Sequence, residues 1–269
     1  MFLFALLLGA GPACPAGDVA GLLGDADRRD EPLPLASQLQ PGLDVTAAYR
    51  IQSRFVLEKL RGARVAGFKA GLTSRAAQQR FGLDRPFAGV LYPGGALPGG
   101  RAVDTRRFPG LTLEIEIGYV VDRDITAPVH DIAALRPLIR AVVPAIELPR
   151  IRFRTPQALT GVDIVAANGG SALFVTGDPL PADALDRVDD LTVTLSRDGT
   201  PVAQGRGDAA LGNQMHALRW LINQTLKLGW AIEAGQLFIT GALAAPLPVE
   251  PGAWRADYGG LGSIDLLLL

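Results

Sequence analysis

A change of pattern at Gly89 constrains the fold more than any other feature of this sequence. From that residue onward, short apolar runs alternate with turns that contain glycine and proline, which is typical of many short strands. The 32 glycines and 20 prolines in the 269-residue chain fit such a turn-rich structure. Asp198-Gly199 supplies the positive φ angles of a tight hairpin. Strands are expected at 89–92, 111–121, 172–176, 191–196, 237–241 and 263–268.

Upstream of Gly89 the apolar residues recur at helical spacing. The pattern predicts an amphipathic helix over 45–60 and a short helix over 74–81 with Ser74 as its N-cap, joined to the N-terminus by a connector at 25–35. Two further helices are expected at 131–139 and 214–228, the second of which ends at Gly229. The chain is therefore predicted to be an α+β protein, with a small helical part at 17–88 and a β-rich catalytic body at 89–269.

The first residues differ from the rest of the chain. Residues 1–10 form a short apolar run, and Ala13-Cys14-Pro15-Ala16 resembles the exit of a secretory signal. We expect residues 1–16 to be a signal peptide and the protein to be periplasmic or secreted. A buried N-terminal helix or a misassigned start codon, in a cytoplasmic protein, is the alternative. The run is too short to span a bilayer, and no other segment is long and apolar enough to do so.

Composition excludes several functions. The formal net charge is −1 and there is no basic block, which argues against a nucleic-acid surface. One cysteine and two histidines rule out a metal site built from thiolates or imidazoles. Any bound metal should therefore be a hard cation held by carboxylate oxygens.

Three glutamates lie in apolar strands. Glu114 and Glu116 share one face of the run 113–117, where an exposed pair of carboxylates is the simplest interpretation. Glu147 lies inside the apolar run 141–148, where a buried charge is costly unless it is paired or bound to metal. It could pair with Arg150 or Arg152 just beyond the run. If it instead meets the other two, the repulsion among three carboxylates would be relieved by Mg²⁺.

Lys69 lies between glycines in Gly67-Phe68-Lys69-Ala70-Gly71. Glycines allow the backbone to approach a ligand closely, and a partly buried lysine near a metal can hold an anion or transfer protons. On its own, the same segment would fit a surface loop.

Several motifs, in this order, resemble the fumarylacetoacetate hydrolase superfamily, and most closely its 2-keto-4-pentenoate hydratase / 2-oxohepta-3-ene-1,7-dioate hydratase branch. The resemblance covers roughly residues 40–269. The motifs are 67–74, 81–86 with 89–91, Glu-x-Glu at 114–116, Pro-Ala-Ile-Glu at 144–147, Val-Ala-Ala-Asn at 165–168, 239–241 and Gly-Gly-Leu-Gly at 259–262.

The resemblance implies a mixed, rolled sheet, a homo-oligomer, and a small 2-oxo or dienoate acid as substrate. It also implies Mg²⁺ as cofactor, with Mn²⁺ possible, held by Glu114, Glu116 and Glu147. Lys69 matches the family's catalytic lysine. Asn168, Thr240 and Gly241 match positions that line the substrate pocket.

The chain departs from the family at two places. Relatives carry an aspartate, thought to assist acid-base chemistry, where this chain has Phe87, and often read Ala-Asp-Asn-Ala-Ser where it has Ala166-Ala167-Asn168-Gly169-Gly170. Both changes remove a carboxylate from near the site.

The activity implied is addition of water to a 2-hydroxy-2,4-dienoate, giving a 4-hydroxy-2-oxo acid. A 4-oxalocrotonate-type decarboxylase and a non-catalytic exported protein that binds oxo acids are the alternatives. A hydrolase of acylpyruvates is disfavoured, because neither histidine precedes the Lys69 motif.

Overall fold

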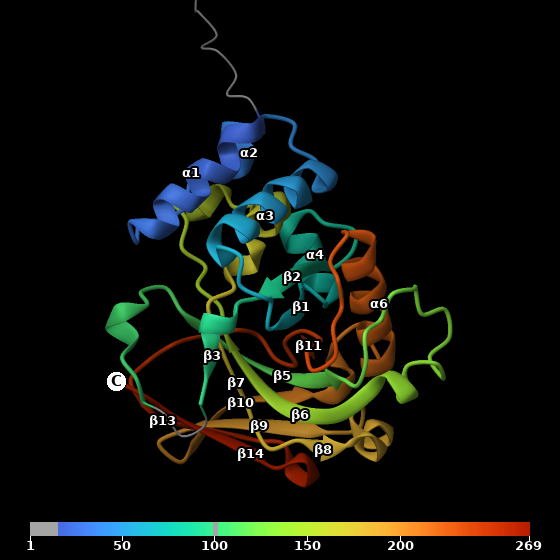
Figure 1. Cartoon of the computed structure of the whole chain (residues 1–269). Helices are drawn as coiled ribbons and strands as arrows, with labels where there is room; N and C mark the ends of the chain where they lie inside the picture. The colour runs from blue at the N-terminus through green and yellow to red at the C-terminus, as the bar shows by residue number, and fades with distance from the viewer. Residues whose placement is uncertain (1–15, 99–101) are drawn as a thin grey trace, which may run out of the picture.

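Most helices gather at one end of the protein, the long helix at 214–227 lies beside the sheets, and two β-sheets form the remainder (Figure 1). The structure is a computed structural model that describes residues 16–98 and 102–269. The helices are α1 (Ala16–Arg28), α2 (Ala36–Leu39), α3 (Val45–Leu60), α4 (Arg75–Phe81), α5 (Gly161–Ala166) and α6 (Gln214–Lys227). The strands are β1 (Gly67–Gly71), β2 (Phe87–Leu91), β3 (Ala96–Leu97), β4 (Ala102–Val103), β5 (Thr112–Val121), β6 (Ile139–Leu148), β7 (Leu173–Thr176), β8 (Leu180–Pro181), β9 (Thr192–Arg197), β10 (Thr200–Arg206), β11 (Leu237–Ile239), β12 (Leu247–Pro248), β13 (Gly252–Asp257) and β14 (Ser263–Leu268).

The larger sheet is mixed and has the order β2-β1-β11-β5-β6-β7-β3, with β12 paired to β5 and β8 to β6. Its two longest strands, β5 and β6, are antiparallel neighbours at its centre. The smaller sheet has the order β10-β9-β13-β14-β4 and lies on the other side of the larger sheet from α1, α2 and α3 (Figure 1). The predicted α+β class and the mixed sheet are confirmed.

The main core explains why one face of β5 is apolar. Ile115, Ile117 and Tyr119 point to the same side and pack in one buried cluster with Leu218 and Leu221 of α6 and with side chains of the smaller sheet. Because side chains alternate along a strand, the glutamates of β5 point to the opposite face.

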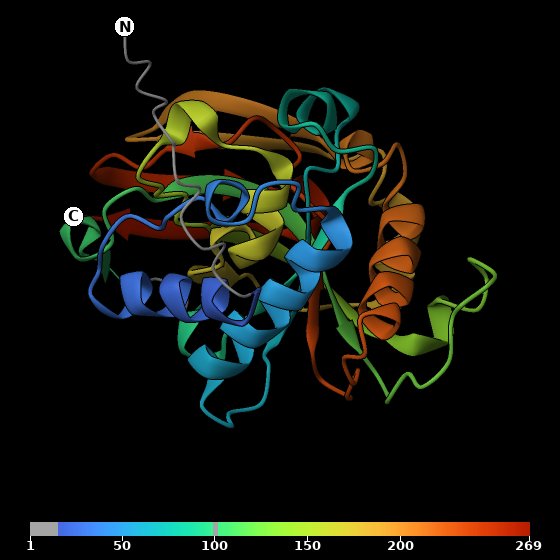
Figure 2. The same cartoon turned by 90° about the horizontal axis from the view of Figure 1, so that it is seen from above.

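A second cluster joins the helical part to the sheet. Val19 and Leu23 of α1 and Phe55 of α3 pack with Phe87 of β2 and with Ile164 of α5. Figure 2 shows α1 beside α3 over the sheets. This cluster covers the end of the sheet at which β1 and β2 lie.

Several predicted elements are confirmed. The two early helices, the late helix α6 and the β9–β10 hairpin at Asp198-Gly199 lie where the sequence placed them. Ser74 accepts a hydrogen bond from the Ala77 amide at the start of α4, as an N-cap does.

Other expectations differ from the structure. The prediction of a connector at 25–35 is wrong for residues 25–28, because α1 continues to Arg28 and Ala26 is buried. The helix at 131–139 is also wrong, since only a 3₁₀ turn with Pro137 precedes β6 there. Within 17–88, expected to be helical, the strands β1 and β2 also occur and belong to the larger sheet.

The signal peptide expected at 1–16 lies outside the described residues apart from Ala16, so that export remains a prediction. Among the residues that the structure describes, no helix has the length and apolar character needed to cross a bilayer.

Candidate active site

Two adjacent strands bring the three glutamates together. Glu114 of β5 lies directly opposite Glu147 of β6, and Glu116 follows on the same face of β5. One carboxylate oxygen of each lies within 4.8 Å of those of the other two. Glu116 and Glu147 are buried, with 0% and 1% of their surface exposed, and Glu114 is half-buried. The exposed-face interpretation of Glu114 and Glu116 is therefore wrong.

This arrangement is unfavourable for three ionised carboxylates. Loss of water contact, reinforced by the charge of Glu147, raises the pKa of Glu114 to about 7. Burial, with the charges of Glu147 and Glu114, raises the pKa of Glu116 well above its usual range. Burial also raises the pKa of Glu147, and nearby Lys69 opposes this shift. The cluster thus favours a positive charge in its midst.

Lys69 provides part of that charge. It lies on β1 with 3% of its surface exposed, and its Nζ atom lies 2.5 Å from Oε1 of Glu147 and 3.0 Å from the carbonyl oxygen of Gly169. Lys69 is therefore a buried partner of the cluster and not a surface-loop residue. The alternative pairing of Glu147 with arginine does not occur, because Arg150 and Arg152 pair with Asp30.

One oxygen of Glu116 remains without a partner. Its Oε2 accepts a hydrogen bond of 2.7 Å from the Gly241 amide, whereas its buried Oε1 has no hydrogen-bond partner. A buried, unsatisfied carboxylate oxygen costs free energy unless a ligand completes it. An oxygen-only set of this kind suits Mg²⁺ or Mn²⁺, which take carboxylates and leave further positions for water and substrate. The residues present therefore fit a divalent cation.

Asn168 and Thr240, predicted to line the substrate pocket, have structural roles in addition. Asn168 Oδ1 accepts a 2.8 Å hydrogen bond from the Val90 amide, and its Nδ2 donates to the Val90 carbonyl at 2.9 Å. The Thr240 hydroxyl donates to Gln214. Gly241 is the one of these three that directly contacts a glutamate side chain, through its amide. Their role in substrate binding remains a prediction.

Phe87 stands where the family resemblance implies an aspartate. It is buried, and its ring lies so close to Gly71 and Gly169 that a Cβ atom on either glycine would lie 2.2 or 2.3 Å from it. Because Phe87 belongs to the cluster that packs α1 and α3 on the sheet, the position serves packing here. It carries no group that could transfer a proton.

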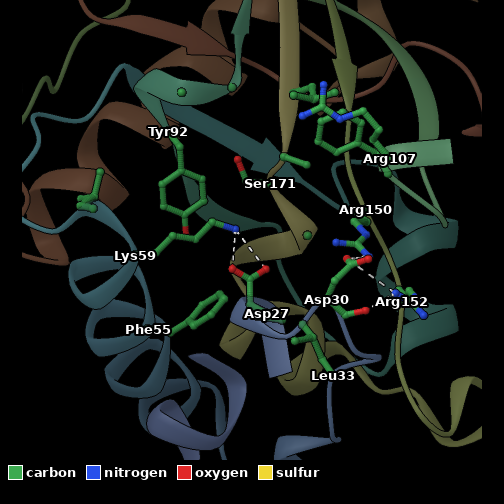
Figure 3. A pocket seen from close by; sticks show the side chains of 18 of the residues that line it. Asp27, Asp30, Leu33, Phe55, Lys59, Tyr92, Arg107, Arg150, Arg152 and Ser171 are labelled. Atoms are coloured by element: carbon green, nitrogen blue, oxygen red, sulfur yellow. Dashed lines mark hydrogen bonds and ion pairs between the residues drawn. The ribbon is translucent and has the colours of Figure 1, made fainter. Parts of the chain in front are cut away.

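A cavity of about 620 Å³ lies between the helical part and the sheet, and none of the three glutamates lines it. Figure 3 shows Lys59 paired with Asp27 on one side and Asp30 paired with Arg150 and Arg152 on the other. The pairs of Asp30 join the helical part to the body, whereas the pair of Lys59 with Asp27 joins α3 to α1 within the helical part. These charged side chains are therefore paired with one another without a ligand.

A second cavity, of about 730 Å³, has Thr73 in its lining. The Thr73 side chain packs against Gly241, where an added Cβ atom would lie 2.5 Å from it, and the Gly241 amide binds Glu116. One wall of this cavity therefore lies two contacts away from Glu116.

Comparison with solved structures defines the class. The chain superposes with a TM-score of 0.87 on 4-oxalocrotonate decarboxylase from Pseudomonas putida G7, solved with magnesium and adipate, at 26% identity over 94% of this chain and 97% of that one. Fumarylpyruvate hydrolase from Pseudomonas aeruginosa, at 16% identity and a TM-score of 0.58 over 75% of this chain and 88% of that one, shares the fold. The fold is that of the fumarylacetoacetate hydrolase superfamily.

Curated relatives identify the branch. The chain is 38% identical to 2-keto-4-pentenoate hydratase from Burkholderia vietnamiensis over 229 residues, which cover 83% of this chain and 86% of that protein. No family model matches the chain. The chain belongs to the 2-keto-4-pentenoate hydratase family, and it is therefore an enzyme of the hydro-lyase class. The alternative of a non-catalytic binding protein is accordingly wrong.

Proposed function

We propose that this protein adds water to a 2-hydroxy-2,4-dienoate, of the 2-keto-4-pentenoate type, with Mg²⁺ or Mn²⁺ held by Glu114, Glu116 and Glu147. The observation that carries the proposal is the convergence of three carboxylates, one with an unpartnered buried oxygen, in a chain of the hydratase family. The relative solved with magnesium and adipate supports both a divalent cation and a carboxylate ligand on this scaffold.

A divalent cation in this cluster would act as a Lewis acid that stabilises negative charge developing on the C2 oxygen of the substrate. The buried walls of the site strengthen such electrostatic effects by excluding water. The Gly241 amide holds one oxygen of Glu116, and the other oxygen, which has no hydrogen-bond partner, is left to bind the cation.

The proposed reaction consists of an isomerisation followed by a hydration. The dienol loses its C2 hydroxyl proton and gains a proton at C5, which gives a 2-oxo-3-enoate. Water then adds its oxygen at C4, because conjugation with the C2 carbonyl makes that carbon electrophilic, and a proton is delivered to C3.

Lys69 supports these steps in two ways. Its ammonium group holds Glu147 at 2.5 Å, which favours the ionised carboxylate, and it places positive charge where a substrate anion would arrive. Because Phe87 cannot act as a base, the proton transfers must use another group or water.

We propose that the substrate approaches from the second cavity, since Thr73 joins it to Gly241. The homo-oligomer that the resemblance implies remains a prediction.

The test is an assay of the metal-replete enzyme with 2-hydroxypenta-2,4-dienoate, with products identified by NMR. The expected product is 4-hydroxy-2-oxopentanoate, formed in wild-type protein and absent with Glu114→Gln. Unchanged turnover in Glu114→Gln would overturn the assigned site.

A decarboxylase is the second candidate, because the 0.87 TM-score is to a 4-oxalocrotonate decarboxylase. Supplying 4-oxalocrotonate and measuring carbon dioxide separates the two. Release of carbon dioxide without formation of a 4-hydroxy-2-oxo acid from the dienoate would favour decarboxylation.

A further inference from the structure

Gln214, the first residue of α6, joins three other segments through one fully buried amide. Its Nε2 donates to the Gly207 carbonyl at 2.6 Å, and its Oε1 accepts from the hydroxyls of Tyr119 at 2.9 Å and Thr240 at 2.6 Å. Tyr119, Gln214 and Thr240 each have 0% of their surface exposed. A buried amide with all these groups satisfied is stabilising, and removal of the Gln214 amide takes a partner from each of the three groups that it binds.

The orientation of the amide follows from its partners. The Gly207 carbonyl can only accept a hydrogen bond, so the NH₂ group must face it and the amide oxygen must face the two hydroxyls. The Thr240 hydroxyl has one proton. The 2.6 Å contact with Gln214 takes that proton in preference to the 3.2 Å approach to the Ile117 carbonyl.

Thr240 connects this network to the glutamate cluster. The next residue, Gly241, donates its amide to Oε2 of Glu116 at 2.7 Å and has a φ of 109°, which favours glycine. On the other strand, Glu116 precedes Ile117, whose carbonyl accepts from the Thr240 amide at 3.3 Å. A shift of Thr240 would therefore move the amide that holds Glu116.

Gln214 is itself held firmly in place. Asn213 caps α6 by accepting a hydrogen bond from the backbone amide of His216 at 3.0 Å. The backbone amide of Gln214 donates to a carboxylate oxygen of Asp189 at 2.7 Å. Because the backbone of Gln214 is fixed at the start of a helix, its side chain holds Thr240 at a fixed position relative to that helix.

We propose that Gln214 is a positioning residue for the metal site. Through Thr240 it fixes the Gly241 amide against one oxygen of Glu116, and so leaves the unpartnered oxygen directed at the cation. The inference rests on the proposed metal-dependent function. Gln214 lies far along the chain from Glu114, Glu116 and Glu147, so the sequence alone does not indicate this role.

The test compares Gln214→Met and Thr240→Val with Tyr119→Phe as a matched control, because the Tyr119 hydrogen bond does not lead to Glu116. Two quantities are measured: hydrogen exchange of the Gly241 amide by NMR in metal-free protein, and the Mg²⁺ dissociation constant by calorimetry. We expect Gln214→Met and Thr240→Val to accelerate Gly241 exchange and to weaken Mg²⁺ binding by about 10- to 100-fold. Tyr119→Phe should change neither by more than about 3-fold, and Thr240→Ser, which keeps the hydroxyl, should restore both.

A purely structural role for Gln214 would lower the melting temperature but leave Gly241 exchange and Mg²⁺ affinity at wild-type values, and that result would overturn the proposal. Should Gln214→Met not fold, Thr240→Val, which has nearly the volume of threonine, decides the question alone. Failure of wild-type protein to bind Mg²⁺ would refute the proposed function, whereas Gly241 exchange would still decide whether Gln214 positions that amide.

Discussion

Glu114 and Glu147 lie directly opposite each other on neighbouring strands, a pairing of like charges that destabilises a sheet. Lys69 compensates part of this charge at 2.5 Å from Glu147, and the Gly241 amide holds Glu116. The repulsion that remains, together with burial, raises the pKa values of the three carboxyl groups. This arrangement fits the proposed cation and lowers the stability of the metal-free protein.

The raised pKa values predict how the stability of the metal-free protein changes with pH. The pKa of Glu114 is about 7 in the folded, metal-free protein against an ordinary value of 4.5, so that the folded state binds more protons between these values. We expect the free energy of unfolding of the metal-free protein to fall as pH rises through this range. Urea unfolding with chelator present, at about pH 5 and about pH 7.5, measures it. Stability that rises over the same interval would contradict the assignment.

Mg²⁺ affinity should change in the opposite direction. Because the cation needs ionised carboxylates, its binding releases protons below about pH 7 and tightens as pH rises. Calorimetry in two buffers of different ionisation enthalpy counts the released protons. Equal affinity at about pH 6 and about pH 8 would show that these carboxyls are not the ligands.

Phe87 should behave as a packing residue. Its ring fills the space beside Gly71 and Gly169, so Phe87→Ala should lower the free energy of unfolding by about 3–5 kcal/mol. Denaturant unfolding of the two proteins measures the difference. A loss of less than about 1 kcal/mol would show that the surrounding side chains close the space.

At the scale of elements, the sequence predicts those whose signals are local. α3 has apolar residues at helical spacing, α4 has Ser74 as its cap, the β9–β10 hairpin has Asp198-Gly199, and α6 ends before Gly229. Each of these signals acts within a few residues, and the structure confirms each element.

The elements that the sequence did not predict depend on distant contacts. The end of α1 is charged, and only packing against α3 shows that Ala26 is buried. α5 has six residues, too few for a clear period, although Thr160 and Asp163 form a capping box at its start. The helix predicted at 131–139 is wrong for a local reason, because Pro137 lies within it and disfavours a continuous α-helix.

The candidate site was also predictable where its signals are local and not where it depends on distant contacts. Alternation along β5 placed Glu114 and Glu116 on one face, and the apolar run marked Glu147, but the register that joins them is set by pairing of β5 with β6. The role of Gln214 was not predicted, since nothing near it in sequence indicates Tyr119 or Thr240 as its partners.

The capping of α3 offers a test at this scale. Asp44 accepts from the Ala47 amide at 2.7 Å, and Asp44→Ala should lower the free energy of unfolding by about 1 kcal/mol. Thermal unfolding measures the loss, and Mg²⁺ affinity should stay at the wild-type value. Loss of Mg²⁺ affinity in this variant would show that the helical part shapes the glutamate cluster.

At the scale of the whole molecule, ion pairs join the helical part to the body. Arg150 and Arg152, just beyond β6, bind Asp30 beyond α1, and Arg154 binds Glu31. β6 therefore carries Glu147 at its end and is tied to the helical part a few residues later. The proposed cation site therefore lies in the sheet, close to the point at which the two parts of the molecule meet.

Metal binding should stabilise the whole fold. A cation that binds only the folded state at 100 times its dissociation constant adds about 2.7 kcal/mol to the free energy of unfolding. We expect Mg²⁺ to raise the melting temperature of wild-type protein, and chelator to reverse the change. The same shift in Glu116→Gln would mean that the cation binds elsewhere.

The most direct measurement is anomalous diffraction from a crystal of the protein grown with Mn²⁺. We expect one strong anomalous peak among the carboxylates, in bonding contact with an oxygen of each of Glu114, Glu116 and Glu147. A well-ordered crystal at saturating Mn²⁺ with no peak among these three side chains would contradict the account.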